Sequence, residues 1–192
     1  GEIQSYYDLL NPKWKDKIMP EREGLGDKRV MIRMDWNMPI TDGVISDTSR
    51  FDVTVPFLKD LAFAGIKIII LAHFGEKGES LKIIADHVTK NLPFIKFTPS
   101  LDFGELEKAS RTIPRGEGIL LENVRLWEGE IENTPSLVRS FVTLGDVFIN
   151  NAFSVSHREH ASVVGVARSM LSYFGPTFMR ELEHLTLALN PI

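Results

Sequence analysis

The sequence predicts an α/β fold in which a three-layer, doubly wound and mainly parallel sheet carries helices on both faces. Two observations predict it. Segments that are apolar nearly throughout alternate along the chain with amphipathic helical patterns, and strands without a polar face belong to sheets that are covered on both sides. The 192 residues suit one domain, residues 1–192, which is long enough to bury most of the surface that the unfolded chain exposes.

The expected strands are short segments of β-branched and apolar residues, bounded by charged or turn residues. In chain order they are Arg29–Met34, Lys67–Ala72, Phe94–Phe97, Gly118–Asn123 and Asp146–Asn150.

The expected helices lie between these strands and after the last one. The first spans Phe51–Ala64, where Thr48 and Ser49 are available to cap its start and Gly65 to end it. The others carry apolar residues at helical spacing: Ser80–Leu92, Pro135–Leu144 and Arg180–Leu189. This alternation makes the predicted sheet Rossmann-like, and Asn190-Pro191 is the only plausible domain boundary.

Composition excludes several classes of function. Hydrophobic residues at 43% and charged residues at 25% are ordinary for a soluble globular protein. A net charge of −4 argues against a protein that coats nucleic acid. The chain has no cysteine, which excludes disulfides and fits a reducing cytosol, and its longest mainly apolar run, Ile66–Leu71, is too short to cross a bilayer. We therefore expect a cytoplasmic protein with no membrane or nucleic-acid partner.

Polar residues recur just after the expected strands, where open parallel sheets bind their ligands. They are Asp35 and Asn37 after the first strand, His73 after the second, Arg125 after the fourth, His157 and Arg158 after the fifth, and Arg50 at the start of the first crossover helix.

These residue types suit a small, hydroxylated, multiply charged anion. Arginine pairs bidentately with carboxylate or phosphate oxygens and stays charged at any working pH. Asp35 and Asn37, two apart on an extended segment, point the same way and can grip a hydroxyl as acceptor and donor. No G-x-S-x-G turn and no nucleotide phosphate loop is present, because Gly24-x-Gly26 precedes a strand and Gly116-x-Gly118 lacks a third glycine. We expect an anionic substrate here and no nucleotide.

Each of these residues also has a structural interpretation. A single arginine after a strand is usually a solvated surface charge, and Asp35 and Asn37 before Pro39 can simply form a turn. His157 and His160 have the spacing of a metal pair, but no third ligand is evident, so no metal site is predicted. Convergence at one sheet edge favours the functional interpretation. The remaining candidates are assigned structural or surface roles on helices: His87, His184, Arg139 and Arg180.

The same segments carry motifs in a recognisable order. Val30–Pro39 resembles an R-V-D-F-N-V-P stretch, Ile70–Gly75 an S-H-L-G loop, and Leu120–Arg125 an L-L-E-N-L-R strand end. Asp146–Phe153, continuing to His157–Ser162, is similar to an N-D-A-F…H-R-x-H-x-S segment. Together, at this spacing and over nearly the whole chain, they resemble the N-terminal, phosphoglycerate-binding domain of the phosphoglycerate kinases.

The resemblance implies a glycolytic transferase. Such a kinase moves a phosphoryl group reversibly between 1,3-bisphosphoglycerate and ADP, with a carboxyl group as acceptor. Its N-terminal domain holds 3-phosphoglycerate or 1,3-bisphosphoglycerate, and a C-terminal domain holds Mg-ATP or Mg-ADP. A hinge closes the two domains and excludes water. The C-terminal domain is absent from this sequence, so we expect this domain to bind no cofactor, to show no kinase turnover alone, and to be a monomer.

The resemblance also implies roles for individual residues. Asp35 and Asn37 would hold the substrate hydroxyl, and Arg50 would bind the carboxyl end and act catalytically by stabilising the transferring phosphoryl group. The remaining residues would bind the non-transferring phosphate or form a basic patch beside it: His73, Arg125 and Arg158 as phosphate contacts, with Arg33, Lys77 and His157 nearby.

The sequence departs from the family pattern within this site. Glu76 and Lys77 stand where the family continues with arginine and proline, and a carboxylate there should weaken the phosphate site. Asn151 replaces an aspartate, and Ser154-Val155-Ser156 replaces a glycine-led turn.

Glu76 therefore keeps open an alternative, a divergent, non-catalytic module that binds a phosphorylated acid or a protein partner. A response-regulator-like switch would need an acidic pocket, which the arginine cluster contradicts.

Overall fold

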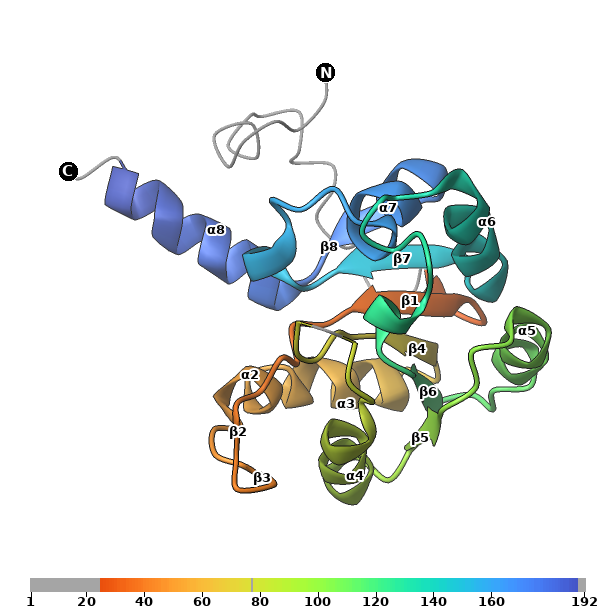
Figure 1. Cartoon of the computed structure of the whole chain (residues 1–192), viewed down its shortest axis with the longest axis horizontal. Coiled ribbons are helices and arrows are strands. Elements are labelled where there is room, and N and C mark those ends of the chain that lie inside the picture. Colours follow the sequence, from red (N-terminus) through yellow and green to blue (C-terminus); the bar gives the residue numbers. More distant parts are fainter. Residues whose placement is uncertain (1–24, 77, 190–192) are drawn as a thin grey trace.

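A six-stranded parallel sheet in the order β5-β6-β4-β1-β7-β8 forms the centre of the molecule. The structure is a computed structural model that describes residues 25–76 and 78–189. A small antiparallel hairpin, β2-β3, lies apart from the sheet (Figure 1). The strands are β1 (Arg29–Arg33), β2 (Ile40–Thr41), β3 (Val44–Ile45), β4 (Lys67–Leu71), β5 (Ile95–Thr98), β6 (Gly118–Leu121), β7 (Val147–Asn150) and β8 (Ser172–Phe174).

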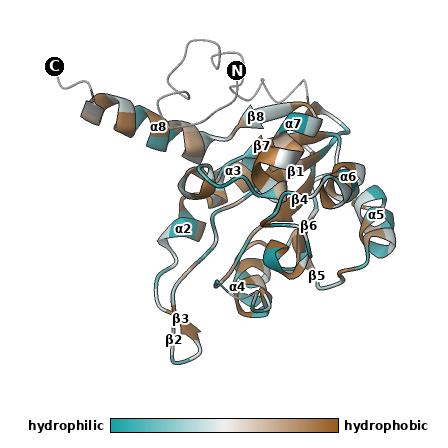
Figure 2. Ribbon diagram, turned by 45° about the horizontal axis from the view of Figure 1, so that its top comes forward, coloured by the Kyte–Doolittle hydropathy of each residue, from teal (hydrophilic) through white to brown (hydrophobic). Residues whose placement is uncertain are grey.

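Helices cover both faces of the sheet, which confirms the predicted three-layer, Rossmann-like class. Side chains alternate between the faces along each strand. Val30 and Ile32 therefore belong to one core cluster, on one face of the sheet, whereas Met31 belongs to a second cluster on the other face. Figure 2 shows the hydrophobic colour concentrated in the strands. The helices are α2 (Ser49–Asp52), α3 (Val55–Phe63), α4 (Lys82–Asn91), α5 (Phe103–Arg111), α6 (Pro135–Leu144), α7 (Val166–Ser169) and α8 (Pro176–Leu189).

Some elements differ from the prediction. The helix expected over Phe51–Ala64 is divided into α2 and α3, and Pro56 stands in the first turn of α3, a position that suits proline. The helix expected from Arg180 begins earlier, at Pro176. The sequence did not suggest β8, α5 or the β2-β3 hairpin, whereas α6 has the predicted bounds.

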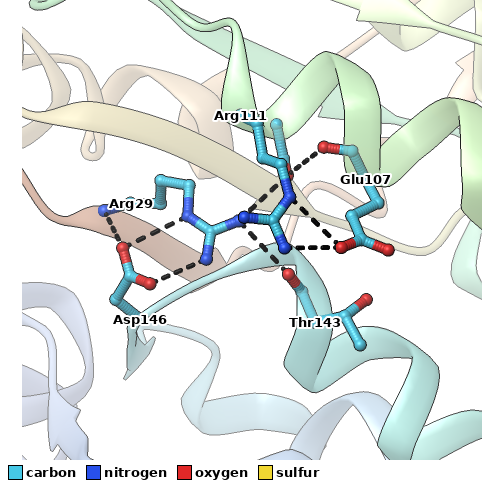
Figure 3. A network of polar contacts seen from close by, with 6 residues as sticks. Arg29, Glu107, Arg111, Thr143 and Asp146 are labelled. Atoms are coloured by element: carbon cyan, nitrogen blue, oxygen red, sulfur yellow. Dashed lines mark hydrogen bonds and ion pairs between the residues drawn. The ribbon is translucent and has the colours of Figure 1, made fainter.

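A polar network closes the amino ends of the strands, opposite the predicted site (Figure 3). Arg29, the first residue of β1, donates from Nη2 to Asp146 Oδ1 at 2.7 Å and from Nε to Oδ2 at 3.2 Å. Its Nη1 donates to Ser110 Oγ in α5 and to the carbonyl of Thr143 in α6. The hydrogen bonds from Arg29 hold the pKa of Asp146 below its usual range. These contacts tie β1, α5, α6 and β7 together and leave the carboxyl ends of the strands open.

Candidate functional site

The predicted site residues gather at the carboxyl edge of the sheet, in two hollows. Asp35 and Asn37 flank Trp36, which is fully buried, and each contributes to a different hollow. The first has a volume of about 320 Å³ and is lined by Asn37, His73, Glu76, Arg125, Ile131, Arg158 and His160. The second has a volume of about 330 Å³ and is lined by Asp35, Ser49, Arg50, Val53, Thr54, Asn151, Phe153, Ser154, Thr177, Arg180 and Glu181.

The loop after β4 shapes one wall of the first hollow. Gly75 has a φ of 63°, in the left-handed region that favours glycine. Its backbone N–H donates to Asn37 Oδ1 at 3.1 Å, and its carbonyl accepts a hydrogen bond from Arg125 Nη1. These bonds connect the residues after β1, β4 and β6. Asn37 and Arg125 are therefore held in place by one shared backbone turn.

Asn123, the second residue after β6, also fixes this loop. Its Nδ2 donates to the carbonyls of Phe74 at 2.7 Å and Glu79 at 2.6 Å. Its Oδ1 accepts a hydrogen bond from the backbone N–H of Arg125 at 3.1 Å. Asn123 is fully buried, so its contribution is to position the loop that carries Arg125.

A buried polar layer lies beneath the first hollow. Arg33, only 1% exposed, donates from Nη2 to His73 Nδ1 at 3.0 Å and from Nε to Ser162 Oγ at 3.2 Å. Ser162 belongs to a π-helical turn, Ala161–Gly165, and its Oγ donates to Glu130 Oε1 at 2.5 Å. Arg33 was expected in a basic patch beside the phosphate. In the structure it is not among the residues that line the hollow, and it supports His73 from below.

Burial decides the charge state of the histidines that line the first hollow. Loss of solvation, reinforced by Arg33 and Arg125, lowers the pKa of His73 to about 2. Loss of solvation, reinforced by Arg158, lowers the pKa of His160 to about 4. Both rings are therefore neutral at pH 7. The positive charge lining the hollow comes from Arg125 and Arg158.

The buried charges below the hollow oppose each other. Burial lowers the pKa of Arg33 to about 10, and the charge of Glu130 acts against this effect. Burial raises the pKa of Glu130, opposed first by the hydrogen bond from Ser162 and then by the charge of Arg33. The layer therefore adds little net charge to the hollow above it.

The neutral histidines predict a loss of stability on acidification. Between pH 6.5 and 4 the unfolded chain binds protons at His73 and His160, whereas the folded chain does not. The free energy of unfolding therefore decreases as the pH is lowered through this window, by up to about 1.4 kcal/mol per pH unit for each histidine. Glu130 contributes with the opposite sign, because its pKa is raised on folding.

Urea denaturation at a series of pH values tests this prediction. In His73→Asn the slope between pH 6.5 and 4.5 should become shallower by up to about 1.4 kcal/mol per pH unit. The contribution of Glu130 cancels in the comparison with the parent chain. An unchanged slope would contradict the assignment of a neutral His73.

The second hollow contains an ion pair. Arg50 Nη1 donates to Asp35 Oδ2 at 2.7 Å, and Ser154 Oγ donates to the same oxygen at 2.7 Å. The other carboxylate oxygen, Asp35 Oδ1, is buried and has no hydrogen-bond partner among the described residues. The Arg50 side chain is 47% exposed. The hollow thus has an accessible cation, Arg50, beside a carboxylate with one buried oxygen that is unpaired within the described ranges.

Asn151 positions the helix that closes the second hollow. Its Oδ1 accepts from the backbone N–H of Thr177 at 2.9 Å, and its Nδ2 donates to Thr177 Oγ1 at 3.2 Å. A Cβ on Gly175 would lie 2.4 Å from Asn151 Oδ1, so the chain passes this amide with no room for a side chain. The first turns of α8 consequently bring Arg180 to the hollow that Arg50 lines, although the sequence suggested only a helix-surface charge.

The remaining candidates are placed less centrally. His157 is exposed and lines neither of the two hollows, and Lys77 lies outside the described residues. Two residues of the site were not predicted from the sequence. Glu130 resembles part of a charged surface loop, and Ser162 could have been found only from the H-R-x-H-x-S segment.

Among the described residues, no three His, Cys, Asp or Glu side chains gather to hold a metal ion. Within the same ranges, no helix has the length and apolar character that a membrane span requires.

A doubly wound parallel sheet with arginines around a hollow at its carboxyl edge defines an α/β domain suited to small anionic ligands. The chain belongs to the phosphoglycerate kinase family, whose model, "Phosphoglycerate kinase", matches residues 21–192.

Among curated relatives, phosphoglycerate kinase of Sinorhizobium medicae is 38% identical over 183 residues, covering 91% of this chain and 46% of that protein. Phosphoglycerate kinase of Cereibacter sphaeroides is 39% identical over 174 residues, covering 86% and 44%. The chain thus spans about half the length of the curated relatives it matches.

Solved structures show the same similarity. Phosphoglycerate kinase from Coxiella burnetii superposes with a TM-score of 0.75 and 32% identity, covering 85% of this chain and 42% of that one. The enzyme from Pyrococcus horikoshii gives a TM-score of 0.80 with 25% identity, covering 91% and 46%. This coverage fits the N-terminal domain that the motifs indicate.

Proposed function

We propose that this chain binds 3-phosphoglycerate and 1,3-bisphosphoglycerate as one half of a glycolytic phosphoglycerate kinase. The observation that carries the proposal is the first hollow, where Arg125 and Arg158 face a space lined by neutral His73 and by Asn37. Two guanidinium groups are sufficient to recognise one phosphate group through charge-assisted hydrogen bonds. The complete protein would transfer a phosphoryl group between 1,3-bisphosphoglycerate and ADP as a cytoplasmic monomer.

The second hollow is proposed to hold the rest of the substrate. Asp35 Oδ1 is a buried acceptor without a described partner, and a substrate hydroxyl would satisfy it. Asn37, which lines the first hollow, would contribute to the same hydroxyl site. Arg50, half-exposed beside Asp35, would bind the carboxyl end and stabilise charge on the transferring phosphoryl group.

The nucleotide is proposed to be held by a second domain outside this chain. Relatives are about twice as long as the matched region, the sequence contains no nucleotide phosphate loop, and no candidate metal cluster occurs in the described residues. Mg-ATP or Mg-ADP would supply the phosphoryl donor or acceptor there. This chain's residues would bind and orient the phosphoglycerate, and residues 1–192 alone are expected to show no turnover with Mg-ATP.

A non-catalytic binding module is the second candidate, and Glu76 is the observation that favours it. Its exposed carboxylate lines the same hollow as Arg125 and Arg158. Burial lowers the pKa of Arg125, and the negative charge of Glu76 opposes this shift, so Glu76 would offset part of the positive charge in the hollow. A module of this kind would retain the fold and bind an anion other than phosphoglycerate.

Chemical-shift NMR at low salt tests the proposed function. Titration with 3-phosphoglycerate should move the resonances of Asp35, Asn37, Arg50, Arg125 and Arg158. Arg158→Ala should weaken binding at least about tenfold, because a hydrogen bond to a charged group contributes about 1.5–3 kcal/mol. Arg50→Ala should abolish the shifts around Asp35. Arg139→Ala, an exposed arginine on α6, is the matched control and should bind like the parent chain.

Two outcomes would contradict the proposal. If millimolar 3-phosphoglycerate leaves the site resonances unmoved in the parent chain, the substrate assignment fails. If inorganic phosphate nonetheless shifts Arg125 and Arg158 alone, the binding-module alternative is favoured.

A further inference from the structure

His73 makes a hydrogen bond that determines which of its ring nitrogens carries the proton. Its Nδ1 lies 3.0 Å from Arg33 Nη2, and both side chains are buried, at 4% and 1% exposure. A guanidinium nitrogen has no acceptor capacity, so Nδ1 must accept this bond through its lone pair. A neutral imidazole whose Nδ1 is an acceptor carries its proton on Nε2.

The orientation of Arg33 is itself fixed by buried partners. Its Nε donates to Ser162 Oγ at 3.2 Å, and its Nη1 donates to the carbonyl of Met34 at 2.6 Å. Ser162 is held in turn by both oxygens of Glu130, through Oγ at 2.5 Å and through its backbone N–H at 3.0 Å. Ser162 stands on the π-helical turn Ala161–Gly165, an irregularity often found at functional sites.

We propose that Glu130 and Ser162, acting through Arg33, set the tautomer of His73 so that its Nε2–H is a neutral hydrogen-bond donor to an anion in the first hollow. Arg33, Ser162 and Glu130 are positioning residues in this arrangement and do not contact the ligand. The class of ligand, a small phosphorylated acid, rests on the proposed function. The tautomer and its cause do not depend on it.

The charges around His73 support a neutral ring. Burial first, then the nearby cations, lowers its pKa to about 2, and a protonated His73 would face Arg33 at hydrogen-bond distance. The groups around the ring are Arg33 below and the residues of the hollow above, namely Glu76, Arg125, Arg158 and His160. A neutral donor adds a hydrogen bond to a bound anion without adding a third cation to the arginine pair.

Nitrogen-15 NMR of the histidine rings reads the tautomer directly. In the parent chain, His73 should show a protonated Nε2 and a bare Nδ1 from pH 8 to pH 5. The charge-balanced double variant Arg33→Met with Glu130→Gln removes the donor to Nδ1 without leaving one buried charge alone. In that variant His73 should populate both tautomers, and its affinity for 3-phosphoglycerate should fall several-fold. Arg139→Met, the matched control on α6, should leave both readouts unchanged.

A second pair of variants remains informative if the double variant does not fold. The amide nitrogen of glutamine reaches the position of Nε2, whereas asparagine reaches only as far as Nδ1. His73→Gln should therefore keep most of the affinity for 3-phosphoglycerate, and His73→Asn should lose about tenfold. Inorganic phosphate, used as a second probe, should follow the same order.

The outcomes separate this inference from the proposed function. A proton on Nδ1 in the parent chain, titration of His73 near pH 6.5, or an unchanged tautomer in a folded double variant would overturn the inference. Equal losses in His73→Gln and His73→Asn would overturn the role of Nε2. If the tautomer is as stated but 3-phosphoglycerate does not bind, only the proposed function fails.

Discussion

Glu130→Gln is expected to lower the free energy of unfolding by about 3–5 kcal/mol at pH 7, because it removes the carboxylate that Ser162 bridges to the buried guanidinium of Arg33. Arg33 is 1% exposed, and Glu130 is the largest charge effect that offsets its burial. Glutamine also has only one acceptor oxygen, so the backbone N–H and the Oγ–H of Ser162 can no longer each donate to an oxygen of their own. Urea denaturation measures the loss. Glu128→Gln, an exposed carboxylate two residues away, is the control and should change stability by less than about 0.5 kcal/mol.

Adding Arg33→Met to Glu130→Gln should recover a large part of this loss. Removing both members of a buried charged pair is often nearly neutral, whereas removing one is not. With Arg33→Met measured alone as well, the variants form a double-mutant cycle that gives the coupling energy between the two residues. Additive losses would show that the two buried charges do not depend on each other.

Phe178→Ala should destabilise the chain by about 3–5 kcal/mol, as expected for truncation of a fully buried aromatic side chain. Phe178 has 0% exposure. Its ring stacks on Phe174, with the ring centroids 4.2 Å apart, and meets Phe153 edge-on, with the centroids 5.2 Å apart. These contacts anchor the first turns of α8, which line the second hollow together with Arg50. The variant should therefore also weaken 3-phosphoglycerate binding in the fraction that remains folded.

Thermal and urea unfolding of Phe178→Ala should be compared with Phe63→Ala. Phe63 is 92% exposed, so its truncation should change stability by less than about 0.5 kcal/mol. Equal effects at the two positions would mean that the small aromatic cluster around α8 does not hold that helix to the sheet.

The sequence was a good guide where one local signal dominated. The buried strands were recognisable because their residues are apolar on both faces. The bounds of α6 were predicted correctly because Pro135 begins it and Gly145 follows its end. β8 was missed because Ser172–Phe174 is a half-buried edge strand of three residues, too short to show a period. α5 was missed because its exposed face is mostly charged and only Leu106 and Ser110 are buried.

The sequence predicted the residues that line the candidate site, but not the buried residues that support them. Residues directly after strands must lie at one edge of a parallel sheet, so His73, Arg125 and Arg158 could be grouped from the sequence. Nothing in the sequence distinguishes a buried charge from a solvated one. Arg33 was therefore counted with the basic patch, and Glu130 was not noticed, because their partnership through Ser162 exists only in the folded chain.

The close approach of Gly175 to Asn151 couples the residues that these two positions can accept. Any side chain at 175 would collide with Asn151 Oδ1, which lies 2.4 Å from the position of its Cβ. Asn151 in turn is engaged by Thr177 at the start of α8. The Cβ of Asn151 also lies within 2.9 Å of that position, so every replacement of Asn151 that keeps a Cβ leaves a close contact. Random libraries that vary both sites should therefore recover a non-glycine residue at 175 rarely, and mainly in clones with glycine at 151.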